Sequence, residues 1–188
     1  AGRNPRRFED KYKERDPQRH AETVAKVLAS GKTPAGMHRP IMVGEILEVL
    51  APRSGELVVD CTLGYGGHAR ELLTRLGPAG HLLGLDADPL ELPKTESRLR
   101  EANFGPEVFT AVRSNFAGLP KALTGCRHRP GAADEGASGA LPRADCILAD
   151  LGLSSMQIDD PARGFSTKFD GPLDMRMNPR RGQSAAAL

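Results

Sequence analysis

The sequence predicts an α/β fold built on a parallel β-sheet. Between residues 57 and 150, short continuous apolar runs alternate with amphipathic stretches. Continuous apolar strands are typical of parallel sheets covered on both faces, and strand–helix alternation is typical of right-handed βαβ units. Predicted strands end at Asp60, Asp86 and Asp150. Because such sheets bind ligands at the carboxyl ends of their strands, these carboxylates indicate a site there.

Two helices are predicted before the sheet. Apolar residues follow helical spacing within residues 17–30, and Gly31 is the expected stop; these apolar residues are Ala21, Val24, Val27 and Leu28. Pro40 is predicted to open a second helix, which extends to Leu50. Four apolar residues are expected on its buried side: Ile41, Ile46, Leu47 and Leu50.

The rest of the chain follows the alternation. The predicted strands are 57–60, 81–85, 108–112 and 144–149, and the predicted helices are 68–76, 88–102 and 116–123. Asp88 and Pro89 cap and start the second of these helices, and Pro93 is expected to shorten it or displace its start. Residues 125–143 are rich in Gly, Ala, Pro and Arg and predict a long flexible loop.

Composition restricts the classes of function. The 188 residues are 39% hydrophobic and 27% charged, which is ordinary for one globular domain. Aromatic residues make up only 4%, which argues against a broad base-stacking sheet. No apolar run approaches the roughly 18 residues that a membrane span needs. Three cysteines without a CxxC pair argue against a disulfide framework or a zinc site.

Charge is unevenly spread along the chain. Residues 1–40 hold ten Lys or Arg and five Asp or Glu, although the net charge of the whole chain is only +2. A basic arm that favours nucleic acid and a solvated, partly helical leader explain this equally well. The acids in this segment argue against a transit peptide, so we expect a cytoplasmic protein.

A glycine-rich segment follows the first predicted strand of the sheet. Gly64, Gly66 and Ala69 satisfy the pattern G-x-G-x-x-A at the start of a helix, and Asp86 ends the next strand. Glycines allow close approach of a ligand, the helix N-terminus favours an anion, and the aspartate can bind ribose hydroxyls. An adenosine-containing cofactor is therefore predicted, with NAD and S-adenosylmethionine both open. The alternative is a tight turn without a ligand.

A second polar segment follows the last predicted strand. Residues 150–177 combine Gly, Pro and paired charges without a clear period. Such a segment at a strand's carboxyl end is typical of an active-site lid or substrate loop, and the alternative is a solvated Ω-loop.

Several motifs together resemble, in order, the ribosomal RNA small subunit methyltransferase H family. They are Met37-His-Arg-Pro-Ile-Met-Val43, Asp60-Cys-Thr-Leu-Gly-Tyr-Gly-Gly-His68, Gly84-Leu-Asp-Ala-Asp-Pro89, Ser114-Asn-Phe116, Ala149-Asp-Leu-Gly-Leu-Ser-Ser155, Arg163-Gly-Phe-Ser166 and Asp170-Gly-Pro-Leu-Asp-Met-Arg-Met177. The resemblance covers about residues 37–188, and the segment from Asp150 to Met177 is its most specific part.

The resemblance implies a Rossmann-like class I methyltransferase fold that uses S-adenosylmethionine to methylate N4 of a cytidine in small-subunit ribosomal RNA. The implied domains are a basic extension (1–36), a cofactor domain (37–150), and a substrate loop with the start of a helical insertion (151–188). The implied cofactor-binding residues are Gly66, Gly67, His68, Asp86, Phe116, Asp150 and Gln157. No metal and no membrane partner is implied, and no catalytic residue is assigned.

Within the resemblance, individual residues carry specific expectations. Gly66, Gly67 and His68 would line the methionine and ribose side of the cofactor, and Phe116 would pack beside the adenine. Asp150 and Gln157 would close the site near the methyl group, and Asp150 is a hypothetical acceptor for the amino group. The expected phosphate contacts are Arg163, Lys168, Arg176, Arg180 and Arg181.

The family's later strands are missing from the sequence, so an incomplete sheet of about four strands is expected. A non-catalytic fragment that binds cofactor or RNA without turnover is therefore the alternative function. A nucleotide-binding oxidoreductase is a more distant one.

Overall fold

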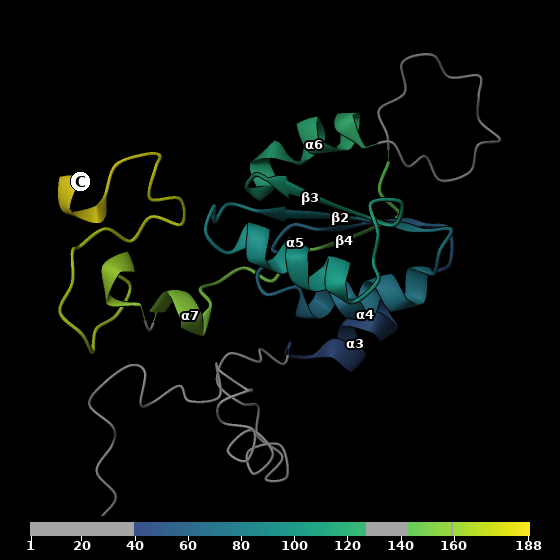
Figure 1. Ribbon diagram of the computed structural model, residues 1–188, viewed down its shortest axis with the longest axis horizontal. Coiled ribbons are helices and arrows are strands. Elements are labelled where there is room, and N and C mark those ends of the chain that lie inside the picture. The colour runs from purple at the N-terminus through teal and green to yellow at the C-terminus, as the bar shows by residue number, and fades with distance from the viewer. Residues whose placement is uncertain (1–39, 127–142, 159) are drawn as a thin grey trace, which may run out of the picture. The chain divides into compact units, whose positions relative to one another are not determined.

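A computed structural model describes residues 40–126, 143–158 and 160–188 (Figure 1). The described residues fall into two units. One comprises residues 40–152 with 176–182, and the other comprises residues 153–175 with 183–188. The predicted helix at 17–30 and most of the predicted loop at 125–143 lie outside the described residues.

The first unit is built on a four-stranded parallel sheet in the order β3-β2-β1-β4. Its strands are β1 (Leu57–Asp60), β2 (His81–Asp86), β3 (Phe109–Arg113) and β4 (Cys146–Leu148). This order is that of the first four strands of the doubly wound Rossmann fold, so the predicted Rossmann-like α/β class is confirmed.

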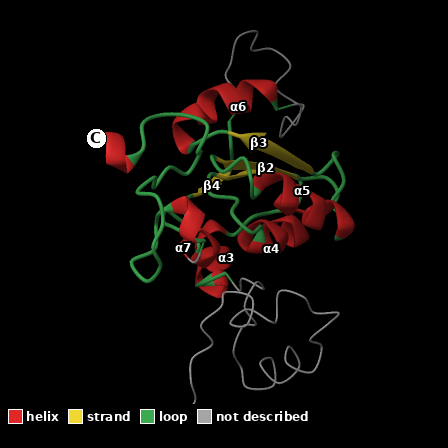
Figure 2. Ribbon diagram, turned by 60° about the vertical axis from the view of Figure 1, so that its left-hand side comes forward, coloured by secondary structure: helices red, strands yellow, loops and turns green. Residues whose placement is uncertain are grey.

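Helices cover both faces of the sheet. Figures 1 and 2 show α6 (Leu119–Gly125) on one face and α4 (Gly67–Leu76) with α5 (Leu92–Glu101) on the other. Since successive strand residues point to opposite faces, Val58 and Leu82 pack with α4 and α5, whereas Val59 and Leu83 pack toward α6. All four residues of β1 are buried, as its unbroken apolar run predicted.

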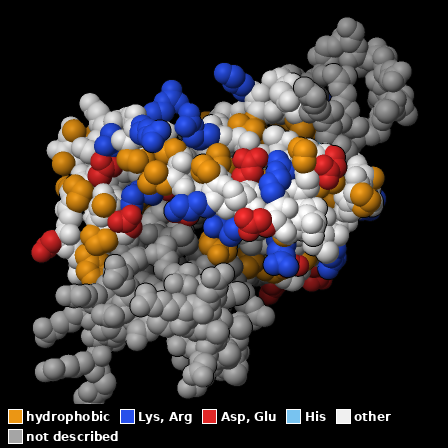
Figure 3. Space-filling model, viewed as in Figure 1, with side chains coloured by type: hydrophobic (Ala, Val, Ile, Leu, Met, Phe, Trp, Pro, Cys, Tyr) orange, Lys and Arg blue, Asp and Glu red, His pale blue; other side chains and the backbone are white. Residues whose placement is uncertain are grey.

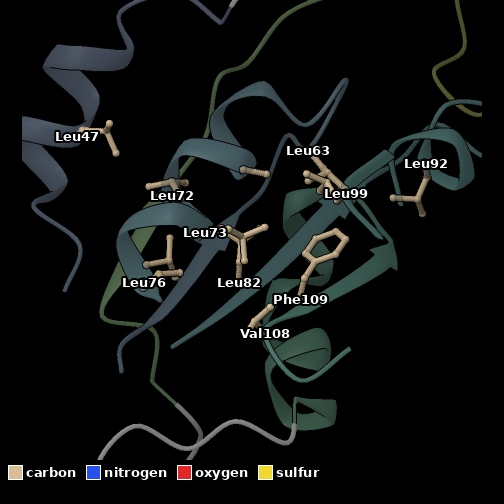
Figure 4. Packing of buried hydrophobic residues seen from close by; sticks show 12 residues of the cluster. Leu47, Leu63, Leu72, Leu73, Leu76, Leu82, Leu92, Leu99, Val108 and Phe109 are labelled. Atoms are coloured by element: carbon tan, nitrogen blue, oxygen red, sulfur yellow. The ribbon is translucent and has the colours of Figure 1, made fainter. Parts of the chain in front are cut away.

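The core beneath α4 and α5 is the larger of the two (Figure 4). It is composed almost entirely of aliphatic side chains with one aromatic ring. Its buried residues are Leu47, Val58, Leu63, Ala69, Leu72, Leu73, Leu76, Leu82, Leu92, Leu99, Val108 and Phe109. At about 1.5–3 kcal/mol for each fully buried large apolar side chain, this cluster is a main source of the unit's stability.

The helix before the sheet begins later than the sequence predicted. It is α3 (Val43–Leu50), and Met42 precedes it in the left-handed conformation with φ 52°. The expectation that Ile41 lies on a buried side is wrong, because its side chain is 64% exposed. Pro40 therefore starts a turn instead of the helix, and Leu47 is the residue of α3 that is buried.

The start of α5 is displaced, as Pro93 led us to expect. The Asp88 carboxylate accepts hydrogen bonds from the backbone N–H groups of Leu90 and Glu91, at 2.8 and 3.4 Å. This turn delays the helix to Leu92, and Pro93 then occupies its first turn, where a missing N–H costs nothing.

Two further elements differ from prediction. Residues 116–118 form a 3-10 turn that leads into α6, instead of one helix over 116–123. Strand β4 spans three residues instead of the predicted six, and it pairs with β1. Within the described part of the chain, β4 lies at one edge of the sheet, and Ile147 is 51% exposed there. None of the described helices is both long enough and apolar enough to span a bilayer.

Candidate functional site

The segment between β1 and α4, together with the first residue of α4, forms a loop over residues 61–67 whose conformation requires glycine. Gly64 and Gly66 have φ of 48° and 83°, a region that side chains with Cβ rarely adopt. A Cβ on Gly66 would lie 2.8 Å from Thr95 Cγ2, and one on Gly67 would lie 2.8 Å from Pro40 Cδ. We call residues 61–67 the glycine loop. Its glycines are therefore explained by packing as well as by the predicted access for a ligand.

Asp86 lies at the carboxyl end of β2 and holds the glycine loop directly. Its Oδ2 accepts a hydrogen bond from Gly64 N at 2.7 Å, and its Oδ1 accepts one from Asp88 N at 2.8 Å. Burial raises the pKa of this carboxyl group above its usual value, against the lowering effect of these two hydrogen bonds. A carboxylate has about four acceptor positions, so Asp86 can still accept hydrogen bonds from a ribose.

Asp60 ends β1 and is 1% exposed. Its Oδ1 accepts hydrogen bonds from Thr62 N at 3.0 Å and Thr62 Oγ1 at 3.3 Å. Burial raises its pKa to about 6, and the nearby His68 opposes this rise. A buried carboxyl group with a raised pKa is a frequent feature of functional sites. The sequence placed Asp60 at a strand end near the expected site, yet the cofactor-binding residues that the resemblance implies do not include it.

Thr62 connects the ends of β1 and β4. Its Oγ1 donates to Asp60 and accepts a hydrogen bond from Asp150 N at 2.8 Å. The Asp150 side chain is 48% exposed, and its Oδ2 lies 4.0 Å from His68 Nδ1. The structure therefore brings Asp60, His68 and Asp150 together at one end of the sheet, where the sequence predicted the two aspartates from their strand-end positions.

Phe116 follows β3 at the same end of the sheet. Ser114 N donates to the main-chain oxygen of Asp86 at 2.9 Å, which ties this segment to the end of β2. The Phe116 side chain is 56% exposed, so it is not an ordinary core phenylalanine. An exposed ring at this end of the sheet is compatible with the predicted adenine contact.

Gln157 belongs to the second unit, where it serves as a helix cap. Ser154 precedes α7 (Ser155–Ile158), and its Oγ accepts from Gln157 N at 3.3 Å, while Gln157 Oε1 accepts from Ser154 N at 3.1 Å. This reciprocal pair is a capping box. The side chain is 6% exposed. Its predicted contact with a cofactor stays a prediction.

In the segment after α7, residues 161–164 pack closely against the backbone of residues 171–175. A Cβ on Gly164 would collide with the backbone of Pro172 and Asp174, and one on Gly171 would collide with the carbonyl of Pro161. Met175 N also donates to Arg163 O at 3.1 Å. These close backbone approaches indicate why glycines occupy both positions.

One of the predicted phosphate contacts is wrong. Arg163 is only 7% exposed and lies within the segment after α7, so it is not available at the surface. Lys168, Arg180 and Arg181 are exposed, and Arg176 donates to the carbonyl of Gly182 at 3.1 Å. Figure 3 shows basic and acidic side chains mixed over the face in view.

The sequence reasoning also missed two residues of α5 that contact the glycine loop. Thr95 and Arg98 are hydrogen-bonded to its backbone. Helical periodicity marks Thr95 as a residue on the face of Leu92 and Leu99, but no local pattern indicates which loop that face meets.

Comparisons with known proteins give the same family that the sequence motifs resemble. A model described as the MraW methylase family matches residues 35–188. The chain is 49% identical over 185 residues to ribosomal RNA small subunit methyltransferase H 1 of Lachnoclostridium phytofermentans, covering 98% of this chain and 46% of that protein. It is 48% identical over 186 residues to ribosomal RNA small subunit methyltransferase H 2 of Alkaliphilus metalliredigens, covering 99% and 49%. The chain thus spans about half the length of these curated relatives.

Proposed function

The chain belongs to the MraW methylase family, and we propose that it forms the cofactor-binding part of an S-adenosylmethionine-dependent methyltransferase that acts on N4 of a cytidine in small-subunit ribosomal RNA. The observation that carries this proposal is the set of carboxylates at the ends of β1, β2 and β4, gathered around the glycine loop. They are Asp60, Asp86 and Asp150.

The residues at this end of the sheet suit such a cofactor. Asp86 has acceptor positions left for the two ribose hydroxyls, and Gly66 and Gly67 present backbone at the N-terminus of α4. The exposed Phe116 ring offers an apolar surface to adenine. The carboxylates of Asp60 and Asp150 are candidates to face the positively charged methionine end.

When bound, S-adenosylmethionine would supply a methyl group carried on a positively charged sulfur, with the neutral thioether as the leaving group. The protein must hold the amino group in line with the S–C bond and exclude water. We assign Asp150 to accept a hydrogen bond from the amino group, which makes the lone pair on that nitrogen more available for attack. Asp150 then receives the proton that the nitrogen loses. Its half-exposed side chain leaves it accessible for both steps.

The substrate assignment depends on the relatives, whose names specify ribosomal RNA of the small subunit. A target base has to leave its stack to reach the carboxyl end of the sheet. Exposed basic side chains are available for phosphate contacts: Lys168, Arg180 and Arg181.

Two measurements test the proposal. The first is calorimetric titration with S-adenosylmethionine, with NAD as competitor and Asp86→Ala as the control variant. We expect binding in the micromolar range that NAD does not displace and that the substitution abolishes. The second is transfer of a labelled methyl group to small ribosomal subunits, followed by identification of the modified base.

The outcomes separate the candidate functions. Label recovered as N4-methylcytidine supports the methyltransferase. Cofactor binding without transfer, in the complete gene product, supports the alternative of a binding module without turnover. Displacement by NAD would instead support an oxidoreductase.

A further inference from the structure

The contacts between α5 and the glycine loop indicate a role for a residue that no motif includes. Resting on the function proposed above, we propose that Arg98 is a positioning residue for the cofactor. It sets the backbone of the glycine loop by stacking on Tyr65 and by hydrogen bonding through Thr95.

Thr95 is the first part of this connection. It is fully buried, and its Oγ1 donates to the carbonyl oxygen of Gly64 at 2.5 Å. Its Cγ2 occupies the space that a Cβ on Gly66 would need. Thr95 therefore contacts both glycines that flank Tyr65, one through a hydrogen bond and the other through packing.

Arg98 completes the connection from one turn further along α5. Its Nη2 donates to Thr95 Oγ1 at 2.5 Å and reaches Tyr65 O at 3.5 Å. Its Cζ lies 3.7 Å from the centre of the Tyr65 ring, well within cation–π range. Because the Thr95 hydroxyl has one proton, which goes to Gly64, the guanidinium must be the donor, and the hydrogen bonds run in one direction from Arg98 to the loop.

The partial burial of Arg98 argues against a role in stability alone. Its Nε is buried and has no hydrogen-bond partner among the described residues. Burial also lowers the pKa of the guanidinium from its usual value. Both features reflect a cost of desolvation, and an apolar side chain often stabilises a desolvated position as well as a charged side chain does. The planar guanidinium instead provides orientation, since it stacks on Tyr65 and hydrogen-bonds to Thr95 at once.

The same helix provides a matched control. Arg100 pairs with Glu96 at 3.1 Å, donates to Phe104 O at 3.0 Å and has its Cζ 5.2 Å from the Phe109 ring. Like Arg98, it lies near an aromatic ring and donates to a backbone carbonyl, and it also pairs with a glutamate, but none of these contacts involves the glycine loop.

The test compares Arg98→Gln with Arg100→Gln in the complete gene product, using S-adenosylhomocysteine binding by calorimetry. We expect Arg98→Gln to raise Kd about tenfold, within the range of a desolvated cation–π contact plus a hydrogen bond. Arg100→Gln should change Kd less than about twofold. Tyr65→Phe keeps the ring and should resemble the wild type, whereas Tyr65→Leu should weaken binding.

Two further measurements exclude a merely structural effect. In a double-mutant cycle, Arg98→Gln should weaken binding much less in the Tyr65→Leu background, because the stack is already lost. In the ligand-free protein, hydrogen exchange at the amides of the glycine loop should accelerate in Arg98→Gln but not in Arg100→Gln.

Unchanged Kd and unchanged exchange in Arg98→Gln would overturn the positioning role while leaving the proposed function intact. Additive effects of the two substitutions would overturn it as well, as would equal losses in both arginine variants. A wild-type protein that binds no S-adenosylhomocysteine would overturn the proposed function itself.

Discussion

His68 faces Asp150 across the carboxyl end of the sheet, with Nδ1 4.0 Å from Oδ2. The other ring nitrogen, Nε2, lies 2.9 Å from the carbonyl oxygen of Ile41. Because a carbonyl can only accept, Nε2 must carry a proton, and Nδ1 of the neutral ring presents its lone pair to Asp150. The His68–Asp150 pair is thus attractive only when the imidazole is protonated. His68 also links the segment before α3 to the end of β4.

Replacing Asp150 with Asn tests its assigned role as an acceptor. We expect the rate of methyl transfer to fall by about 10²-fold or more, since a proton acceptor is removed. The Kd for cofactor should change only a few-fold, as expected for an exposed residue. Single-turnover transfer and calorimetry measure the two quantities, with the exposed Glu101→Gln as control. Equal losses in rate and affinity would contradict the assignment.

Replacing Asp86 with Ala should weaken the fold as well as the binding of cofactor. The carboxylate accepts hydrogen bonds from Gly64 N and Asp88 N, and the substitution leaves both donors without this partner. The free energy of unfolding should fall by about 1–3 kcal/mol. Urea denaturation without ligand measures this effect. Unchanged stability would show that Asp86 does not organise the glycine loop.

The raised pKa of Asp60 predicts a pH-dependent stability. Its value of about 6 exceeds the ordinary 3.8, so the folded protein binds this proton more tightly than the unfolded chain does. The carboxyl group therefore contributes stability at low pH, and this contribution is lost as pH rises through about 6. Asp60→Asn removes the charge and keeps an oxygen for Thr62, so it should stabilise the protein above pH 6 by up to about 3 kcal/mol.

Denaturation of wild type and Asp60→Asn across the pH range checks this prediction. The difference between them should shrink as pH falls and vanish near the ordinary pKa of an aspartate, about 4. A constant difference at every pH would mean that Asp60 does not titrate in this range. We also expect the variant to bind cofactor less well, since it lacks a charge at the site.

Gly67→Ala tests the close contact between α4 and the segment before α3. The new Cβ would lie 2.8 Å from Pro40 Cδ, and a proline ring cannot move aside easily. The free energy of unfolding should fall by about 1–3 kcal/mol. Gly44→Ala is the matched control, because nothing lies within 4 Å of its added Cβ inside α3. That change should stabilise the protein by about 0.5–1 kcal/mol. Equal effects would contradict the contact.

Strand positions were easier to predict than helix starts. The unbroken apolar run gave β1 its bounds, and β2 was correct apart from the assignment of Asp86 to the strand itself. The signal is local, since a buried strand must be apolar at each position. Helix starts depend on turns: Met42 in a left-handed conformation delays α3, and the Asp88 turn delays α5. Those turns depend on contacts that the spacing of apolar residues along the sequence does not reveal.

By itself, the sequence determined the family, the parallel α/β fold and the placement of Asp60, Asp86 and Asp150 at strand ends. Each follows from short motifs or from local periodicity. Only the tertiary structure decided which groups those carboxylates meet. The Asp86 carboxylate accepts a hydrogen bond from Gly64, which is 22 residues away in the sequence, and Thr62 accepts one from Asp150, which is 88 residues away. The tertiary structure also places the Arg98 guanidinium over the Tyr65 ring and buries the Arg163 side chain. Such contacts arise when separate elements pack together, so their geometry is a property of the whole fold.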